Sequence, residues 1–253
     1  MLAPLLSALL AAAPPCLLPP PRAPFPFRPG EILDLEISVL GAAKVGELKL
    51  TVERPTSAGR VQPLTAQIRS TARLGSVQRF TAVGKSWVNA RTLGLDRYLE
   101  TAEEDGRRKS TDLKVVPGAS AFELVQDDGG RTTRTRIDRR GELLDAITAL
   151  YHLRAVRPSP SARFCFDMVG DGRSWRVEGT VSERPETIEV PAGSFRAWRL
   201  EATARPATGP GEPRPLWLWL SDDPRRLPLA VVAEVELGPV SAKLVAARAG
   251  PGP

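Results

Sequence analysis

The residue types best suited to catalysis or metal binding are scarce in this sequence. His152 is the only histidine, and Cys16 and Cys165 are the only cysteines. A zinc site needs several Cys or His ligands, and a Ser-His-Asp triad needs a histidine base beside its nucleophile. We expect His152 on the solvent side of a helix, and Cys165, inside the apolar run 164–166, as a buried unreactive thiol. The sequence therefore predicts no metal site and no cofactor.

Two groups of neighbouring carboxylates are the remaining candidates for catalysis, Asp222-Asp223 and Glu103-Glu104-Asp105. A glycosidase needs only two acids at a suitable separation. Both groups fall at the ends of predicted strands beside Gly or Pro, where solvated turns are common. No G-x-S-x-G or P-loop spacing occurs either. We therefore expect no catalytic residues and no enzyme, with a carboxylate-based hydrolase as the least favoured alternative.

One predicted strand is apolar on both of its faces. Within residues 216–220, Trp217 and Trp219 share one face while leucines occupy the other. Such a strand is either covered on both sides or lines a cavity. Trp217 and Trp219, together with Tyr151 on the apolar face of a predicted helix, are the expected ligand-binding residues.

Arg154 falls on the same apolar helix face, three residues after Tyr151. Its side chain can extend outward to water or bond the last carbonyls of the helix. The alternative is a buried structural ion pair, with Asp223 as the first expected partner and Asp167 or Glu201 as the next.

The elements that must position these residues are mostly short strands. Residues 33–39 and 48–52 alternate apolar and polar side chains around a small-residue loop, which is typical of a hairpin with one wet face. A single segment, 143–156, has its apolar residues at helical spacing. Further strands are expected at 64–70, 86–90, 97–103, 110–116, 121–125, 133–138, 163–169, 175–182, 187–190, 194–204, 216–220, 229–237 and 240–246. The predicted class is all-β with one central helix, a curled antiparallel sheet or an open or closed barrel-like roll, because one helix cannot cover so many strands.

The N-terminal segment suggests export. Residues 1–13 form an apolar run ending in alanines, as in a secretory signal peptide, and the run is shorter than the roughly 20 residues of a transmembrane helix. Prolines recur densely over 14–29, which predicts an extended tether. Cys16 allows an alternative in which this residue is lipidated after signal removal. The expected division is a signal peptide 1–13, a tether 14–29, a single β-rich domain 30–248 and a disordered tail 249–253.

Composition indicates a folded globular chain, because 42% of the residues are hydrophobic and 25% are charged. The formal charge of +6 and a pI of about 9.8 would suit nucleic acid or an anionic membrane surface. Acidic residues are nevertheless interspersed throughout, and no recognition motif accompanies the charge. Nucleic acid is therefore not an expected partner.

Four segments carry a resemblance to a known family. They are Phe27-x-Pro29-Gly30-Glu31, the helical segment 145–154, the run 190–195, and 219–223 followed by Arg226-Leu227-Pro228. In this order, over about residues 27 to 246, they resemble a family of exported bacterial envelope proteins known as domain of unknown function 3108. The resemblance implies a β-rich periplasmic or surface domain, loosely similar in fold to open-barrel carriers of the lipoprotein-localisation type. It implies no catalytic residues.

These observations favour a non-enzymatic binding or carrier module in the periplasm or at the outer-membrane surface of a Gram-negative bacterium. The expected ligand is a lipid or another apolar or amphipathic envelope molecule. The alternative is a structural or assembly partner that contacts other envelope proteins, with the face around Arg134 and Arg136 as its docking surface.

Overall fold

The computed structural model describes residues 17–40, 43–71, 79–138, 142–170, 172–235 and 238–250. These residues form one α-helix and sixteen strands, fifteen of which correspond to predicted strands, while the short strand β9 was not predicted. The strands are β1 Ile32–Val39, β2 Ala43–Val52, β3 Val61–Ser70, β4 Phe80–Asn89, β5 Leu95–Glu104, β6 Arg107–Val115, β7 Ala121–Asp128, β8 Arg131–Asp138, β9 Leu143–Leu144, β10 Arg163–Gly170, β11 Arg173–Val181, β12 Glu186–Val190, β13 Gly193–Pro206, β14 Arg214–Ser221, β15 Pro228–Val235 and β16 Gly238–Arg248, and the helix is α1 Ala146–Ala155.

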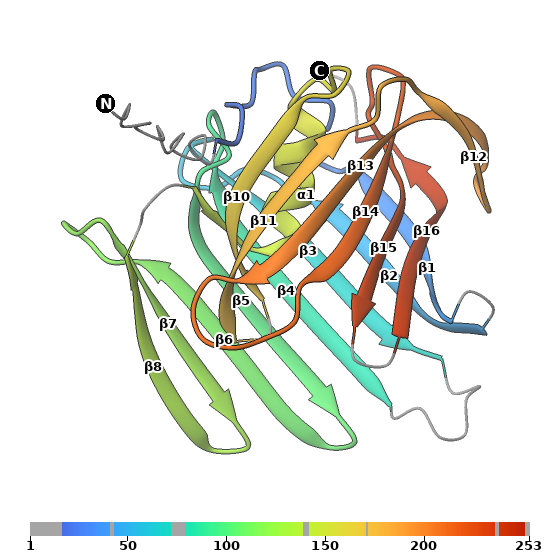
Figure 1. The fold of residues 1–253 in the computed structure, drawn as a ribbon. Coiled ribbons are helices and arrows are strands. Elements are labelled where there is room, and N and C mark those ends of the chain that lie inside the picture. The colour runs from blue at the N-terminus through green and yellow to red at the C-terminus, as the bar shows by residue number, and fades with distance from the viewer. Residues whose placement is uncertain are drawn as a thin grey trace, which may run out of the picture.

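All strands belong to a single sheet with the order β8-β7-β6-β5-β4-β3-β2-β1-β16-β15-β14-β13-β11-β10-β9, and β12 pairs with β13 off this path. The first and last strands are neighbours, with Leu35 opposite Leu244. The pairs are antiparallel except β9 with β10, which is parallel. The two edges of the sheet, β8 and β9, therefore come from the middle of the chain. Figure 1 shows the sheet curling around α1, with β7 and β8 projecting away from β10 and β11.

Alternation along the strands places one face of each strand inside the curl. In β4, Ala82, Ser86 and Val88 are buried, whereas Val83 is 49% exposed. Helix residue Ile147 packs with the core side chains of β3 to β7, and Ala149 packs with those of β10 to β14. Burial of each large apolar side chain stabilises the fold by about 1.5–3 kcal/mol. The helix thus joins the two halves of the curled sheet.

Asp145 is the N-cap residue of the helix. Its carboxylate accepts hydrogen bonds from the N–H groups of Ile147 at 2.8 Å and Thr148 at 3.1 Å, which satisfies two donors that the first helical turn leaves free. Ser86 of β4 also donates to this carboxylate, at 2.8 Å, and fixes the start of the helix to the sheet. The helix ends at Ala155, because Val156 is extended ahead of Pro158.

Residues 17–29 pack against the domain, which differs from the extended tether expected over 14–29. We call them the N-terminal strap. Phe27 is buried and meets the ring of Tyr151 edge-on, with 4.8 Å between the ring centroids. The carbonyl oxygen of Pro19 lies 3.2 Å from Nε2 of His152. The strap covers the helix face that was expected to meet solvent, so the expectation of an exposed His152 is wrong, and this residue is only 3% exposed.

Within the described segments, no helix has both the length and the apolar character needed to cross a membrane. Residues 1–16, which include the expected signal peptide and Cys16, lie outside the described residues.

Candidate functional site

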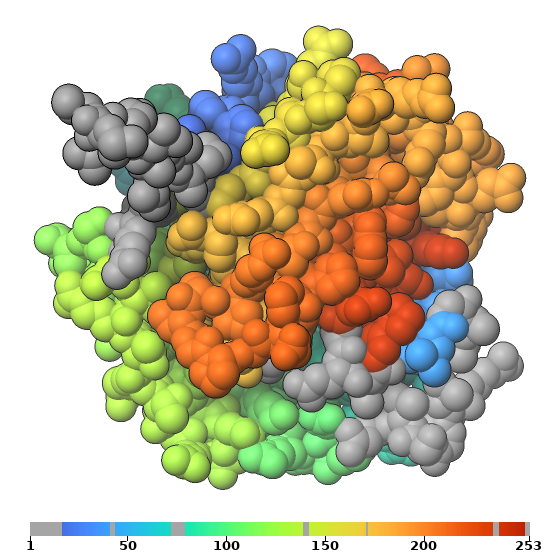
Figure 2. All heavy atoms as spheres, in the orientation of Figure 1, coloured from blue at the N-terminus to red at the C-terminus, as the bar shows by residue number. Residues whose placement is uncertain are grey.

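The candidate site lies where the sheet fails to close, and we call it the seam cleft. It has a volume of about 440 Å³ and lies between β7 and β8 on one side and β10 and β11 on the other, with the loop after β13 at one end. In Figure 2 the yellow-green surface of β7 and β8 lies beside the orange surface of that loop. The strand order requires such an opening, because β8 pairs only with β7 and β10 pairs with β9 and β11.

Three apolar side chains line the seam cleft, namely Leu124 of β7, Ile137 of β8 and Leu143 of β9. Leu124 and Leu143 belong to the core cluster that also contains helix residues Ile147 and Tyr151, and Ile137 packs against this cluster. Ile137 is half-buried, whereas the other residues of β8 are exposed. The hydrophobic core therefore continues to the wall of the cleft, and an apolar group placed there would extend it.

Charged side chains surround this apolar wall. Arg176 of β11 donates to both carboxylate oxygens of Asp167 on β10, at 2.5 and 3.1 Å. These hydrogen bonds raise the pKa of Arg176 above its ordinary value. Arg136 Nε lies 3.7 Å from an oxygen of Asp138 on the same strand. The cleft thus combines an apolar wall with a charged rim, which suits an amphipathic ligand.

The three expected ligand-binding residues do not meet in one site. Trp217 lies on the outer face of β14 and lines a separate open hollow of about 910 Å³. Trp219, also on the outer face, donates from Nε1 to Glu186 of β12 at 2.7 Å. Tyr151 is 0% exposed within the core, where a ligand has no access. The inner face of β14 carries Leu218 and Leu220, so the doubly apolar pattern reflects core on one side and partly covered indoles on the other.

Arg154 forms a buried ion pair, but with Glu31 rather than with Asp223. Its Nη1 and Nη2 atoms donate to the two oxygens of Glu31 at 2.7 and 3.1 Å. The Arg154 side chain is 0% exposed and that of Glu31 is 4% exposed. The guanidinium also lies 5.4 Å from the ring centroid of Phe27 and 5.0 Å from that of Tyr151, within the range of a cation–π contact.

Asp223 does not contact Arg154 itself but stabilises the turn whose carbonyls do. It accepts hydrogen bonds from the backbone N–H groups of Arg225 at 2.7 Å and Arg226 at 3.2 Å, and so holds a tight turn. The carbonyls of the same turn accept from Arg154, at 3.0 Å for Arg226 and 3.3 Å for Arg225. Asp167 is committed to Arg176 instead. The sequence analysis did not predict Glu31 as the partner of Arg154. Both residues lie in segments that resemble the family, and this shared membership is the sequence feature that could have suggested the pair.

Cys165 is disulfide-bonded. The expectation of a free thiol at this position is therefore wrong. The backbone N–H of Cys165 also donates to the carbonyl of Leu17 at 3.1 Å, which pairs the strap with β10 at this point. The chain has one other cysteine, Cys16, next to Leu17 in sequence and outside the described residues.

The carboxylate groups considered for catalysis have structural partners. Asp222 accepts from Nε1 of Trp198 at 2.8 Å, and Asp105 accepts from the backbone of Arg79 at 3.1 Å. Glu104 pairs with Lys109 at 3.3 Å. Among the described residues, no group of three or more His, Cys, Asp or Glu side chains could hold a metal ion.

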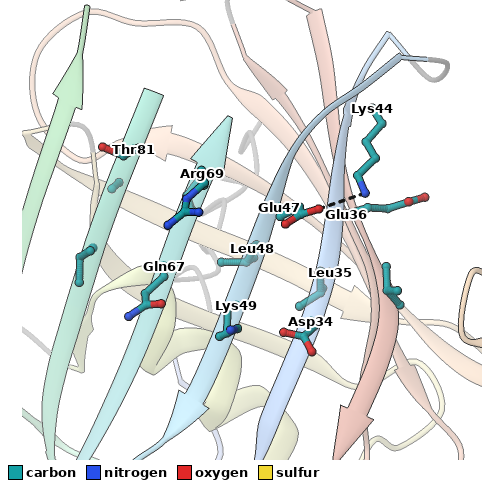
Figure 3. Close-up of a pocket in the computed structure, with 14 residues that line it drawn as sticks. Asp34, Leu35, Glu36, Lys44, Glu47, Leu48, Lys49, Gln67, Arg69 and Thr81 are labelled. Atoms are coloured by element: carbon teal, nitrogen blue, oxygen red, sulfur yellow. Dashed lines mark hydrogen bonds and ion pairs between the residues drawn. The ribbon is translucent and has the colours of Figure 1, made fainter. Parts of the chain in front are cut away.

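A second cleft, of about 510 Å³, lies over β1 to β4 (Figure 3). Its charged lining is balanced, because the acidic residues Asp34, Glu36 and Glu47 accompany the basic residues Lys44, Lys49 and Arg69. Lys44 and Glu47 form an ion pair at 3.3 Å. With its charges balanced, this surface gives no reason to favour one class of ligand.

Comparison with solved structures supports the fold. A beta-barrel-like protein of domain of unknown function DUF1849 from Brucella abortus is similar to this chain, with a TM-score of 0.61 at 8% sequence identity, over 89% of this chain and 99% of that one. A candidate exported protein with a YmcC-like fold from Bacteroides fragilis has a TM-score of 0.33 at 12% identity, over 88% of this chain and 98% of that one. A candidate lipoprotein from Parabacteroides distasonis has a TM-score of 0.32 at 9% identity, with the same coverage. Only the first likeness is strong enough to bear on the fold.

No curated protein sequence matches this chain. The family described as "Protein of unknown function (DUF3108)" matches residues 35–245, which span the sheet from β1 to β16. The chain therefore belongs to the DUF3108 family.

Proposed function

We propose that this protein is a non-enzymatic binding or carrier module for an apolar or amphipathic molecule of the cell envelope, and that the seam cleft holds the ligand. The observation that carries the proposal is the unclosed sheet, whose opening forms a cleft of about 440 Å³ in which the half-buried Ile137 lies beside the core residues Leu124 and Leu143. Sites for small ligands are usually concave, have volumes of about 300–1,000 Å³, and combine apolar walls with a few polar groups.

The proposed location is outside the cytoplasm, in the periplasm or at the outer-membrane surface. The disulfide at Cys165 supports this location, because disulfides persist mainly in oxidising compartments. The apolar run 1–13 supports it independently as a signal peptide.

A displacement experiment tests the proposed site. The protein, prepared in oxidising conditions, is titrated with the neutral apolar fluorophore 1-N-phenylnaphthylamine, and single-chain amphiphiles then compete for it. Replacing Ile137 with glutamate should weaken binding about tenfold or more, because a carboxylate would interrupt the apolar wall. Trp217→Ala is the matched control, since Trp217 lines a different hollow and should leave the affinity unchanged.

Two results would contradict the assignment to the seam cleft. One is unchanged affinity in an Ile137→Glu protein whose circular dichroism matches the wild type. The other is loss of binding in Trp217→Ala, which would move the site to the outer hollow of β14.

A role in envelope assembly is the second candidate, and the free edge of β8 is the observation in its favour. The strand has eight residues, and its outer edge carries no partner strand in the described sheet. A strand of another protein could pair with such an edge. If so, charge reversal at Arg134 and Arg136 should alter a pull-down from envelope extracts while leaving amphiphile binding intact.

A further inference from the structure

The charges of the seam cleft do not cancel. Its lining contains Arg136, Arg173 and Arg176 against Asp138 and Asp167. Each aspartate is paired with an arginine of the same lining, Asp167 with Arg176 and Asp138 with Arg136. Arg173 forms no ion pair with a carboxylate of the described residues. The cleft therefore carries one positive charge that the described fold leaves without a counterion.

Arg173 lines the seam cleft and a neighbouring hollow. It begins β11, and the neighbouring hollow is formed with the loop 210–214. Its guanidinium lies 5.4 Å from the ring centroid of Trp175. Trp175 is itself fixed, being buried and donating from Nε1 to the carbonyl of Gly170 at 2.9 Å. The cation thus lies over a rigid aromatic platform.

A second guanidinium approaches the same indole. Arg214 of β14 lies 4.8 Å from the Trp175 centroid. Glu212 and Glu234 line the same hollow as Arg214, so the net positive charge of the seam cleft comes from its own lining. Arg173 of β11 and the apolar residues Leu124 and Ile137 of β7 and β8 line the same cleft.

We infer that the seam cleft selects an anionic amphiphile, with the acyl chain along Leu124, Ile137 and Leu143 and a phosphate or carboxylate head on Arg173. This inference rests on the proposed function and adds the class of ligand. A guanidinium matches these heads geometrically and can donate two parallel hydrogen bonds.

Two amphiphiles with the same chain test the inference, both used below their critical micelle concentrations. Dodecyl phosphate is anionic and 1-dodecylglycerol is neutral, and each displaces 1-N-phenylnaphthylamine from the full chain. We expect dodecyl phosphate to bind about tenfold more tightly, the effect of one charge-assisted hydrogen-bonded contact. Arg173→Gln should remove this preference, Arg173→Lys should restore part of it, and Arg134→Gln, on β8 but outside the cleft lining, should leave it unchanged. Inorganic phosphate alone should not displace the fluorophore.

Each other outcome has a distinct meaning. If both amphiphiles bind equally and Arg173→Gln changes nothing, the inference is overturned while the proposed function stands. If neither amphiphile binds, the proposed function itself fails. If inorganic phosphate competes as well as dodecyl phosphate, the site recognises the free anion, and the assignment of an acyl chain to the apolar wall is overturned.

Discussion

Replacing Arg154 with methionine should lower the free energy of unfolding by about 3–5 kcal/mol, because it leaves the carboxylate of Glu31 buried without a counterion. Methionine keeps much of the apolar stem, so the loss is mainly electrostatic. The structure gives three reasons for a value in this range. The guanidinium is 0% exposed, it donates twice to Glu31, and it donates to two carbonyls of the turn 225–226.

Urea unfolding followed by tryptophan fluorescence at pH 7 measures this loss, with an unchanged dependence on urea taken as the sign that the native state is intact. The pair Arg107–Asp128 is the matched control. It is also bidentate, with both distances 2.8 Å, but its side chains are 62% and 46% exposed. Arg107→Met should therefore cost no more than about 1 kcal/mol.

A double-mutant cycle separates the pair from the rest of the site. Arg154→Met with Glu31→Gln should cost clearly less than the sum of the two single replacements, because the double variant leaves no unpaired buried charge. The reasoning is refuted if Arg154→Met costs as little as the exposed control, or if the two single losses simply add.

Two further predictions concern packing and pH. Gly179→Ala should destabilise the fold by about 1–3 kcal/mol, because the new Cβ would lie 2.5 Å from the carbonyl oxygen of Glu201 and 2.7 Å from Cβ of Ala202. Gly94→Ala is the control and should cost less, since the atom nearest to its new Cβ is 3.4 Å away. Equal urea midpoints for the two variants would contradict this prediction. Burial lowers the pKa of His152, so the unfolded chain takes up a proton at a higher pH than the folded chain, and the free energy of unfolding should fall as the pH drops below about 6.5. His152→Gln should show a weaker fall over the same range, and parallel pH profiles for the two proteins would show that His152 does not contribute.

The strands could be predicted because the burial of each strand is visible in its own sequence. A sheet with one buried face imposes a period of two on the sequence, and β1 and β2 show it with few exceptions. The helix could be predicted as well, because the apolar residues of segment 143–156 recur at helical spacing. The boundaries differ by a few residues, and Leu143 and Leu144 form the short strand β9 instead of the first helical turn. Such local signals do not depend on which distant segment covers an element.

The errors arose where a distant segment decides the environment. His152 was expected in water because its helix face looked polar, but Pro19, 133 residues earlier, lies against it. Glu31 lies 123 residues from Arg154, and no local pattern joins them. The strap was expected to be a tether because its prolines exclude helix and central strand. Proline restricts backbone conformation without preventing Phe27 from packing, so composition alone could not place the strap.

The position of the seam follows from the strand order, which places the two ends of the chain in the middle of the sheet and its mid-chain strands at the edges. β1 pairs with β16, so the sheet is continuous on the side away from the seam. Inside the curl, the strap and α1 pack together, and the buried ion pair between Arg154 and Glu31 joins α1 to the segment before β1. In the described sheet β8 pairs only with β7, so β8 keeps a free edge. A free edge normally invites aggregation, and charged residues on it are a common protection. β8 carries Arg131, Arg134 and Arg136 and a single half-buried apolar residue, Ile137, at the cleft. An edge protected in this way can remain open in solution and still offer an apolar wall to a ligand, which is why the seam, rather than the buried Tyr151 or the outer tryptophans, is the better candidate for the site.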